Sequence, residues 1–135
     1  RYYFKKRVQD LLFPYLLRLL APGPGPKQPT EKELKAVYKA EGIIIEDISR
    51  HYQISELARK VALNEFDLKA VFKKVFGMGP YEYLIKQRMK NARLLLESGL
   101  SVKEVAAKTG YRPTDLTTAF IKYYGFTPSS VKKKP

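Results

Sequence analysis

The sequence predicts an all-α protein in which one helical unit occurs twice. Apolar residues recur with helical spacing along the 135-residue chain, and the alternating pattern typical of strands is lacking. The stretch "ISELARKVALNEFDLKAVFKKVFG" (residues 54–77) shares its apolar frame with "VKEVAAKTGYRPTDLTTAFIKYYG" (residues 102–125), 48 positions later. Because the polar positions differ between the two copies, we interpret the frame as a repeated fold whose variable positions carry recognition.

The N-terminal segment, residues 1–21, is expected to form an amphipathic helix. Its apolar residues follow helical spacing, although Pro14 would kink or shorten the helix. Residues 22–30, "PGPGPKQPT", hold four prolines and two glycines and are typical of a linker. Since the chain opens with Arg1 rather than Met, we expect a longer protein. Residues 1–20 would then pair with a second copy or pack on a sensor domain, and lying on a membrane surface is the alternative.

The main domain is expected over residues 31–133, and it begins with a helix. Thr30 and Glu33 have the spacing of a capping box, in which each side chain bonds to the other residue's backbone N–H. Gly42 weakens the helix without ending it. An apolar stripe carries the helix to about His51, through Leu34, Val37, Tyr38, Ile44, Ile45 and Ile48.

Each repeated frame predicts a short helix, a tight turn and a longer second helix. Equivalent residues occupy the same frame positions: Leu57 and Val105, Ala58 and Ala106, Ala62 and Gly110, Leu68 and Leu116, Phe72 and Phe120, Gly77 and Gly125, Pro80 and Pro128. We expect a small residue in each short helix, Ala58 and Ala106, where the second helix crosses closely, and a tight turn four residues later, at Ala62 and Gly110. This is the pattern of a helix-turn-helix unit, about 54–77 and about 102–125.

A long linker helix, about 80–98, is expected between the two units. Pro80 suits its first turn, Gly99 suits its end, and Ser101 with Glu104 forms a second capping box. Its buried stripe comprises Tyr83, Leu84, Met89, Ala92, Leu95 and Leu96. Nineteen residues of helix span about 28 Å, and successive major-groove faces of DNA lie about 34 Å apart. The longer second helix of each unit, held by a rod of this length, could therefore enter one of two adjacent major grooves.

The exposed faces of the two second helices are the candidate DNA-binding residues. In the first unit, a helical projection places Phe66, Lys69, Ala70 and Lys73 opposite the buried Leu and Phe. The aromatic ring suits thymine methyls or sugars, and the lysines suit phosphate or guanine. The alternative is that Phe66 belongs to the core and the lysines are solvated.

In the second unit the equivalent face holds threonines, which can bind several bases or phosphate, or stand as exposed filler. Its candidate residues are Arg112, Pro113, Thr114, Thr117, Thr118 and Lys122, with Ile121 beside them.

The net charge of +13 favours nucleic acid or an anionic membrane as the partner. Residues 1–30 carry +5 (six basic, one acidic), residues 31–60 are neutral (six of each), and residues 61–135 carry +8 (fourteen basic, six acidic). A merely solvated basic surface is the alternative. No apolar run approaches the roughly 18 residues that span a bilayer, and we expect no membrane partner. The tyrosines Tyr38, Tyr83 and Tyr123 occupy apolar stripe positions and are expected in the core.

Enzyme chemistry finds little support in the sequence. The chain has no cysteine, and its one histidine, His51, has no cluster of ligands around it. The carboxylates of Glu31, Glu33, Glu46 and Asp47 suit helix caps and solvated faces better than a catalytic pair. "PGPGP" lacks the Lys and Ser/Thr of a phosphate-binding loop. We expect no enzyme activity, no cofactor and no metal ion.

Residues 31–133 resemble the DNA-binding region of the AraC/XylS family of bacterial transcription regulators. The motifs are the first frame, "PYEYLIKQRMKNARLLLESGLSVKEVAAKTGY" and "FIKYYGFTPSSV". The resemblance implies a seven-helix, double helix-turn-helix DNA-binding domain and an upstream effector domain. It also implies RNA polymerase as a further partner. The protein would be a transcription activator, as many relatives are, and would lie in the cytoplasm on the bacterial nucleoid. The resemblance further implies which residues face base edges: Phe66, Lys69, Ala70, Pro113, Thr114, Thr117 and Thr118.

Three departures from the family pattern stand out. Ala62 replaces a common turn glycine, Ala70 replaces a long polar residue, and the segment from Gly110 to Phe120 is one residue shorter than usual. Details such as "VALNEFDLK" resemble the branch that regulates iron–siderophore uptake. The function expected is sequence-specific binding of double-stranded DNA, and non-specific binding of nucleic acid or a membrane surface by a basic module is the alternative.

Overall fold

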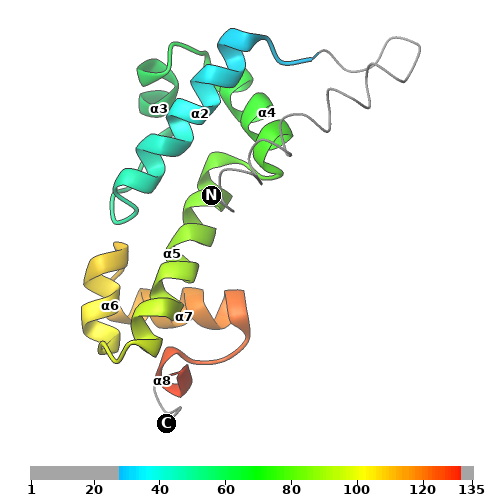
Figure 1. The fold of residues 1–135 in the computed structure, drawn as a ribbon. Coiled ribbons are helices and arrows are strands. Elements are labelled where there is room, and N and C mark those ends of the chain that lie inside the picture. Colours follow the sequence, from blue (N-terminus) through cyan, green and yellow to red (C-terminus); the bar gives the residue numbers. More distant parts are fainter. Residues whose placement is uncertain (1–27, 132–135) are drawn as a thin grey trace.

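The structure, a computed structural model, describes residues 28–131, and this part consists of seven α-helices without a strand. In Figure 1, α2, α3 and α4 gather at one end of the long helix α5, and α6, α7 and α8 gather at the other end. The helices are α2 (Glu31–Glu46), α3 (Ile54–Lys60), α4 (Glu65–Phe76), α5 (Pro80–Glu97), α6 (Val102–Thr109), α7 (Pro113–Tyr124) and α8 (Pro128–Val131). The predicted all-α fold with two helix-turn-helix units is confirmed. The amphipathic helix predicted over residues 1–21 lies outside the described residues.

The two predicted capping boxes are present. The Thr30 N–H donates to Glu33 Oε1 (2.8 Å), and the Glu33 N–H donates to Thr30 Oγ1 (3.0 Å). Ser101 and Glu104 exchange the same pair of bonds, each 3.1 Å long, at the start of α6. Each box satisfies two backbone N–H groups that a helix start leaves without an intrahelical partner. Local sequence therefore sets where α2 and α6 begin.

Helix α2 ends at Glu46, five residues before the predicted end near His51. Asp47 is extended (φ −147°, ψ 91°), and its carboxylate accepts hydrogen bonds from the Oγ–H and the N–H of Ser49. These bonds lower the pKa of Asp47. A side chain that bonds to the backbone two residues ahead competes with the helix. Ile45, predicted in the apolar stripe, lies in the last turn of α2 outside its buried face and is 39% exposed.

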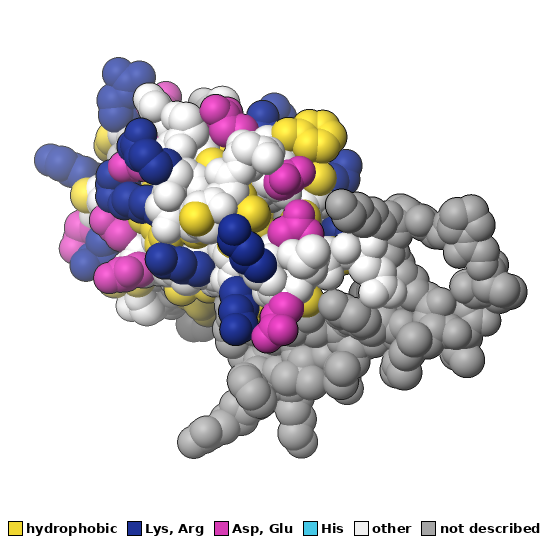
Figure 2. All heavy atoms as spheres, turned by 90° about the horizontal axis from the view of Figure 1, so that it is seen from above, with side chains coloured by type: hydrophobic (Ala, Val, Ile, Leu, Met, Phe, Trp, Pro, Cys, Tyr) yellow, Lys and Arg dark blue, Asp and Glu magenta, His cyan; other side chains and the backbone are white. Residues whose placement is uncertain are grey.

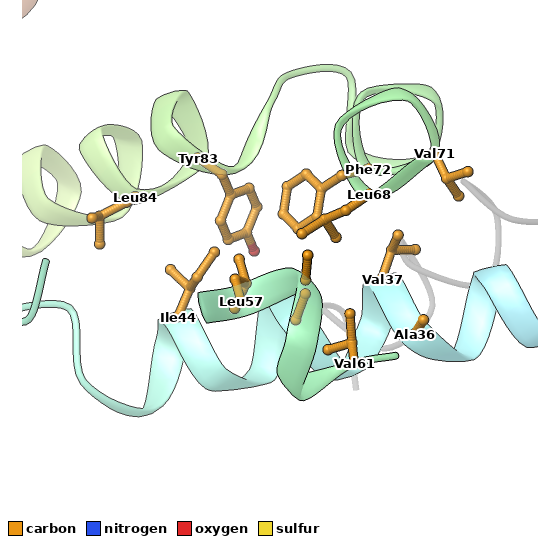
Figure 3. Packing of buried hydrophobic residues seen from close by; sticks show 12 residues of the cluster. Ala36, Val37, Ile44, Leu57, Val61, Leu68, Val71, Phe72, Tyr83 and Leu84 are labelled. Carbon is orange, nitrogen blue, oxygen red and sulfur yellow. The ribbon is translucent and has the colours of Figure 1, made fainter. Parts of the chain in front are cut away.

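The first unit has a core to which four helices contribute. Figure 3 shows side chains of α2, α4 and α5 meeting over α3, with the rings of Phe72 and Tyr83 side by side. Their centroids lie 5.5 Å apart in an edge-to-face arrangement, a favourable geometry for aromatic pairs. Val37, Ile44, Leu57, Leu68 and Leu84 complete the centre of this core.

The second unit has its own core, built from the other half of α5. Its buried residues are Met89, Ala92, Leu96, Val105, Ala106, Leu116, Phe120 and Val131. Helix α5 therefore contributes Tyr83 and Leu84 to the first core and Met89, Ala92 and Leu96 to the second. One continuous helix of 18 residues, about 27 Å long, therefore belongs to both cores and connects the two units rigidly.

Ala62 and Gly110 lie in the turns that follow the short helices, as predicted. Helices α3 and α6 end at Lys60 and Thr109, and both turn residues are left-handed (φ 59° and 86°). The small residues buried inside the short helices are Ala58 and Ala106, at 3% and 0% exposure.

The two units keep one register throughout. Helices α3 and α6 begin 48 positions apart, as do α4 and α7. Pro113 and Thr114 of α7 are therefore equivalent to Glu65 and Phe66 of α4.

Tyr123 is a further correction, since it is 46% exposed instead of buried. It stands in the last turn of α7, and its ring lies against Tyr124 at 5.0 Å, which leaves its other side to solvent. Tyr83 is buried as predicted, and Tyr38 is half-buried.

Candidate nucleic-acid interface

Helix α4 presents the predicted face to solvent. Leu68 and Phe72 are fully buried and fix the rotation of the helix about its axis. Phe66 consequently points outward and is 80% exposed, and Lys69, Ala70 and Lys73 are exposed with it. Burying a phenylalanine side chain is worth about 1.5–3 kcal/mol, and this gain remains available to a partner that covers the ring of Phe66. The alternative that Phe66 belongs to the core is ruled out.

The lysines of this face carry no acidic partner within ion-pair distance in residues 28–131, unlike Lys35, which lies 3.4 Å from Glu31, and Lys60, which lies 4.0 Å from Glu56. Figure 2 looks onto the end of the molecule formed by α2, α3 and α4, and there Lys and Arg side chains are interspersed with acidic ones. The cationic character of α4 is therefore local, at Lys69 and Lys73, and does not belong to a uniformly basic surface.

Helix α7 presents the second face. Thr114, Thr118 and Lys122 are exposed, Thr117 is half-buried, and Ile121 is 42% exposed. The Oγ1–H of Thr117 donates to the Pro113 carbonyl, and that of Thr118 donates to the Thr114 carbonyl, both at 3.1 Å. With its proton directed into the helix, each hydroxyl oxygen remains an acceptor on the surface. Such oxygens suit the amino groups of cytosine or adenine in the major groove.

The start of α7 combines a cation with an anion. Arg112 precedes the helix with its side chain 84% exposed, and its Nε–H donates to Asp115 Oδ2 at 2.9 Å. Pro113 follows at the first helical position and is exposed. Sequence reasoning overlooked Asp115, although its spacing of three residues from Arg112 indicates the pair. A phosphate bound by Arg112 would have to replace or share this partner.

The residues of each predicted set are exposed, apart from the half-buried Thr117, and Figure 1 shows their helices, α4 and α7, in separate units. Equivalent positions pair Phe66 with Thr114, Lys69 with Thr117, Ala70 with Thr118, and Lys73 with Ile121. Whether these residues contact DNA stays a prediction.

No group of three or more His, Cys, Asp or Glu residues in residues 28–131 is arranged to hold a metal ion. Within the same range, none of the helices combines the length and the apolar character needed to cross a bilayer.

Two short-helix, turn and longer-helix units on one shared helix define a double helix-turn-helix protein. The family described as "Helix-turn-helix domain" matches residues 57–134. An AraC-like transcription regulator of Streptomyces lividans is 33% identical over 91 residues, which are 66% of this chain and 30% of that protein. The chain belongs to the AraC family of helix-turn-helix transcription regulators. It spans about a third of the length of this relative.

Two solved structures share the fold. The C-terminal domain of the two-component response regulator yesN from Fusobacterium nucleatum is 32% identical, with a TM-score of 0.66. The match covers 73% of this chain and 99% of that domain. The DNA-binding domain of AdpA, solved in complex with a target DNA, is 26% identical with a TM-score of 0.66, covering 72% of this chain and 89% of that domain.

Proposed function

We propose that this chain is the DNA-binding part of a bacterial transcription regulator and that it binds a specific double-stranded site through two successive major grooves. The observation that carries the proposal is the pair of equivalent exposed faces on α4 and α7, at the two ends of one shared helix about 27 Å long. Successive major grooves on one face of DNA recur about every 34 Å. The structural likeness to the AdpA domain, solved with its target DNA, supports the same conclusion.

The two faces would divide the work. On α4, Lys69 and Lys73 bind phosphate or guanine, and Phe66 packs on thymine methyls or sugars beside the small Ala70.

On α7, the threonine oxygens of Thr114, Thr117 and Thr118 accept hydrogen bonds from base amino groups, while Arg112 and Lys122 bind phosphate, and Pro113 leaves the helix start free to approach the backbone. Arg112 already shares its charge with Asp115, whereas Lys69 and Lys73 have no acidic partner within ion-pair distance in residues 28–131. The first unit therefore contributes more of the salt-dependent affinity than the second.

The proposal extends to the rest of the chain. In this proposal residues 1–21 form a helix used for dimerisation or for packing on an effector domain, residues 22–30 form a linker, and residues 31–133 bind DNA. RNA polymerase is a second partner, the protein acts in the cytoplasm on the nucleoid, and it performs no enzyme reaction. Relatives whose names describe operon regulation and activation support this role.

Selection of binding sites from a randomised duplex pool at about 0.1 M salt tests the proposal. We expect two short motifs whose centres are separated by about one helical turn, 10–10.5 base pairs. Enrichment of no motif, with binding that collapses as salt rises, would instead indicate a non-specific basic module.

Variants then assign the contacts. The double variant Lys69→Ala/Lys73→Ala should lower the slope of log affinity against log salt by roughly 0.9 for each phosphate that these lysines neutralise. Lys35→Ala is the matched control, because Lys35 is an exposed lysine of α2 that already has an acidic partner, Glu31. An equal effect of the control and the double variant would contradict the assignment to α4.

A further inference from the structure

The two helix-turn-helix units touch each other directly, through residues that belong to neither candidate DNA-binding set. The contact is made by the loop after α2, residues 48–50, and by the turn of the second unit, Gly110 and Tyr111. In Figure 1 this loop extends toward the unit formed by α6 and α7. We call these residues, together with Arg88 of α5, the inter-unit contact.

Arg88 is the centre of the inter-unit contact. It lies midway along α5 and is only 8% exposed. Its Nε–H donates to the Ile48 carbonyl at 2.7 Å, and one Nη–H donates to the Arg50 carbonyl at 3.2 Å. On its other side the guanidinium lies over the Tyr111 ring, 4.9 Å from the centroid. One buried cation therefore joins the loop of the first unit to the turn of the second.

Arg88 bonds to backbone carbonyls, and no carboxylate in residues 28–131 lies within 4.0 Å of its guanidinium nitrogens. Besides the hydrogen bonds from Ser49, its charge also contributes to the lowered pKa of Asp47. A buried cation that is deprived of its partners keeps its desolvation cost, so the contact is expensive to break. A guanidinium can bind two carbonyls in one plane and stack on a ring at once, which an ammonium cannot do. The two hydrogen bonds to carbonyls depend on the position of the loop, and the ring contact depends on the position of the turn that carries Tyr111.

Gly110 brings the two backbones together. A Cβ atom at Gly110 would lie 2.8 Å from both the C and the Cα of Ser49, a distance that side-chain carbons do not tolerate. Other glycines with similar backbone angles, such as Gly125, have open space around them.

The loop is also fixed from its own side. Asp47 accepts hydrogen bonds from Ser49, and Arg50 pairs with Glu56 at 2.6 Å. The inter-unit contact is therefore built from preorganised parts.

We propose that Arg88 is a positioning residue for DNA recognition: by joining the two units it fixes the rotation of α7 relative to α4 and restricts the protein to one spacing between its two half-sites. The inference rests on the proposed function above. Helix α5 alone sets the distance between the units, but a helix that bends or twists slightly still allows one unit to rotate against the other. Each added base pair rotates the second half-site by about 35° and moves it by about 3.4 Å. A second anchoring point resists that displacement.

The test compares spacing profiles. The full chain first selects its site, and the affinity is then measured on that site and on versions with one base pair inserted or removed between the two motifs. For the unaltered chain we expect each change to weaken binding about tenfold, as when one recognition helix no longer reaches its bases. Arg88→Met, which keeps length and apolar bulk, should reduce this penalty to about threefold or less while also weakening binding to the optimal site.

The matched control is Arg93→Met on the same helix. Arg93 pairs with Glu97 at 3.7 Å and lies over the Tyr124 and Phe126 rings, so its partners belong to α5 and to the second unit alone. This variant should keep the spacing penalty of the unaltered chain. Arg88→Lys keeps the charge but not the two hydrogen bonds in one plane. Its spacing penalty should lie between that of the unaltered chain and that of Arg88→Met.

Two outcomes overturn the inference, and they differ from failure of the proposed function. If the unaltered chain selects paired motifs and Arg88→Met retains the full spacing penalty, α5 alone sets the spacing and the inference is wrong. If the unaltered chain selects no motif, the proposed function itself fails and the inference falls with it. Should Arg88→Met lose its helical circular dichroism, Tyr111→Leu decides, because it removes the ring from Arg88 and leaves the buried cation bonded to the loop. A full spacing penalty in a folded Tyr111→Leu variant overturns the inference.

Discussion

The substitutions Ala62→Gly and Gly110→Ala are expected to change stability in opposite directions, although the two positions are equivalent in the two units. Ala62 is the single non-glycine residue with positive φ (59°) in residues 28–131. The left-handed region costs an L-residue about 1–2 kcal/mol. Ala62→Gly removes that strain. It also lowers stability by about 0.4–1 kcal/mol, because glycine has greater freedom in the unfolded chain. The net expectation is a gain of about 0.5–1 kcal/mol.

Gly110→Ala reverses each of these contributions and adds a steric one. The alanine incurs the same strain at φ 86°, and its Cβ would press on the backbone of Ser49, 2.8 Å from the carbonyl carbon. Overpacking of this kind costs about 1–3 kcal/mol. After the unfolded-state gain is subtracted, we expect a loss of about 2–4 kcal/mol, a large part of the stability of a small domain.

Urea unfolding followed by helical circular dichroism measures both changes in the free energy of unfolding. Gly125→Ala is the matched control, since its φ of 87° is nearly identical and a Cβ there would meet nothing within 4 Å. The excess loss in Gly110→Ala over Gly125→Ala isolates the contact with Ser49, at about 1–3 kcal/mol. Equal losses in the two variants would refute the inter-unit packing at Gly110, and destabilisation by Ala62→Gly would refute the strain assigned to Ala62.

Three further predictions concern a cap, a face and a pH response. Ser101→Ala should cost about 1 kcal/mol in urea unfolding, because it removes the bond to the Glu104 N–H, and a change below about 0.3 kcal/mol would contradict the capping assignment. Phe66→Ala should change stability by at most about 0.5 kcal/mol, since the ring is 80% exposed, yet should weaken binding to the selected DNA about tenfold in a mobility-shift titration; a stability loss comparable to a core truncation would contradict the exposed placement. Burial raises the pKa of Tyr52 above its usual 10.0, so the folded state holds the phenol proton more tightly than the unfolded state does. The stability that this proton contributes is complete below pH 10 and is lost as the pH rises through the pKa of the folded state. Urea midpoints measured from about pH 9 to about pH 11.5 should therefore fall less steeply for Tyr52→Phe than for the unaltered chain, and parallel curves would count against this assignment.

The helix starts were predictable because their signals are local. In both capping boxes the donor and the acceptor lie three residues apart, so the sequence itself brings them together. The end of α2 depends on an equally local signal, the bond from Ser49 to Asp47. Apolar periodicity masked it, since Ile45 and Ile48 extend the stripe beyond the last helical residue. Two local signals conflicted there, and the side-chain hydrogen bonds prevailed.

The exposed faces of α4 and α7 were predictable for a related reason, whereas the inter-unit contact was not. Once Leu68 and Phe72 are buried, the rotation of α4 is fixed and the outward residues follow from helical geometry. Arg88 differs, because its hydrogen-bond acceptors are backbone carbonyls, which every residue carries. The sequence shows that Arg88 lies next to the buried stripe of α5, but it gives no signal for which loop will come close to this residue.

The chemistry of the two faces makes this inter-unit contact consequential. The lysines of α4 give the first unit an affinity of its own, whereas the acceptor oxygens and methyls of α7 offer weak and permissive contacts. A weakly binding unit contributes when a rigid connection makes its binding effectively intramolecular, and its contribution falls as that connection loosens. Loosening at Arg88 should therefore weaken the sequence preference in the second half-site before that in the first. Site selection repeated with Arg88→Met should show a second motif with lower information content beside an unchanged first motif, and equal weakening of both motifs would contradict this division between the units.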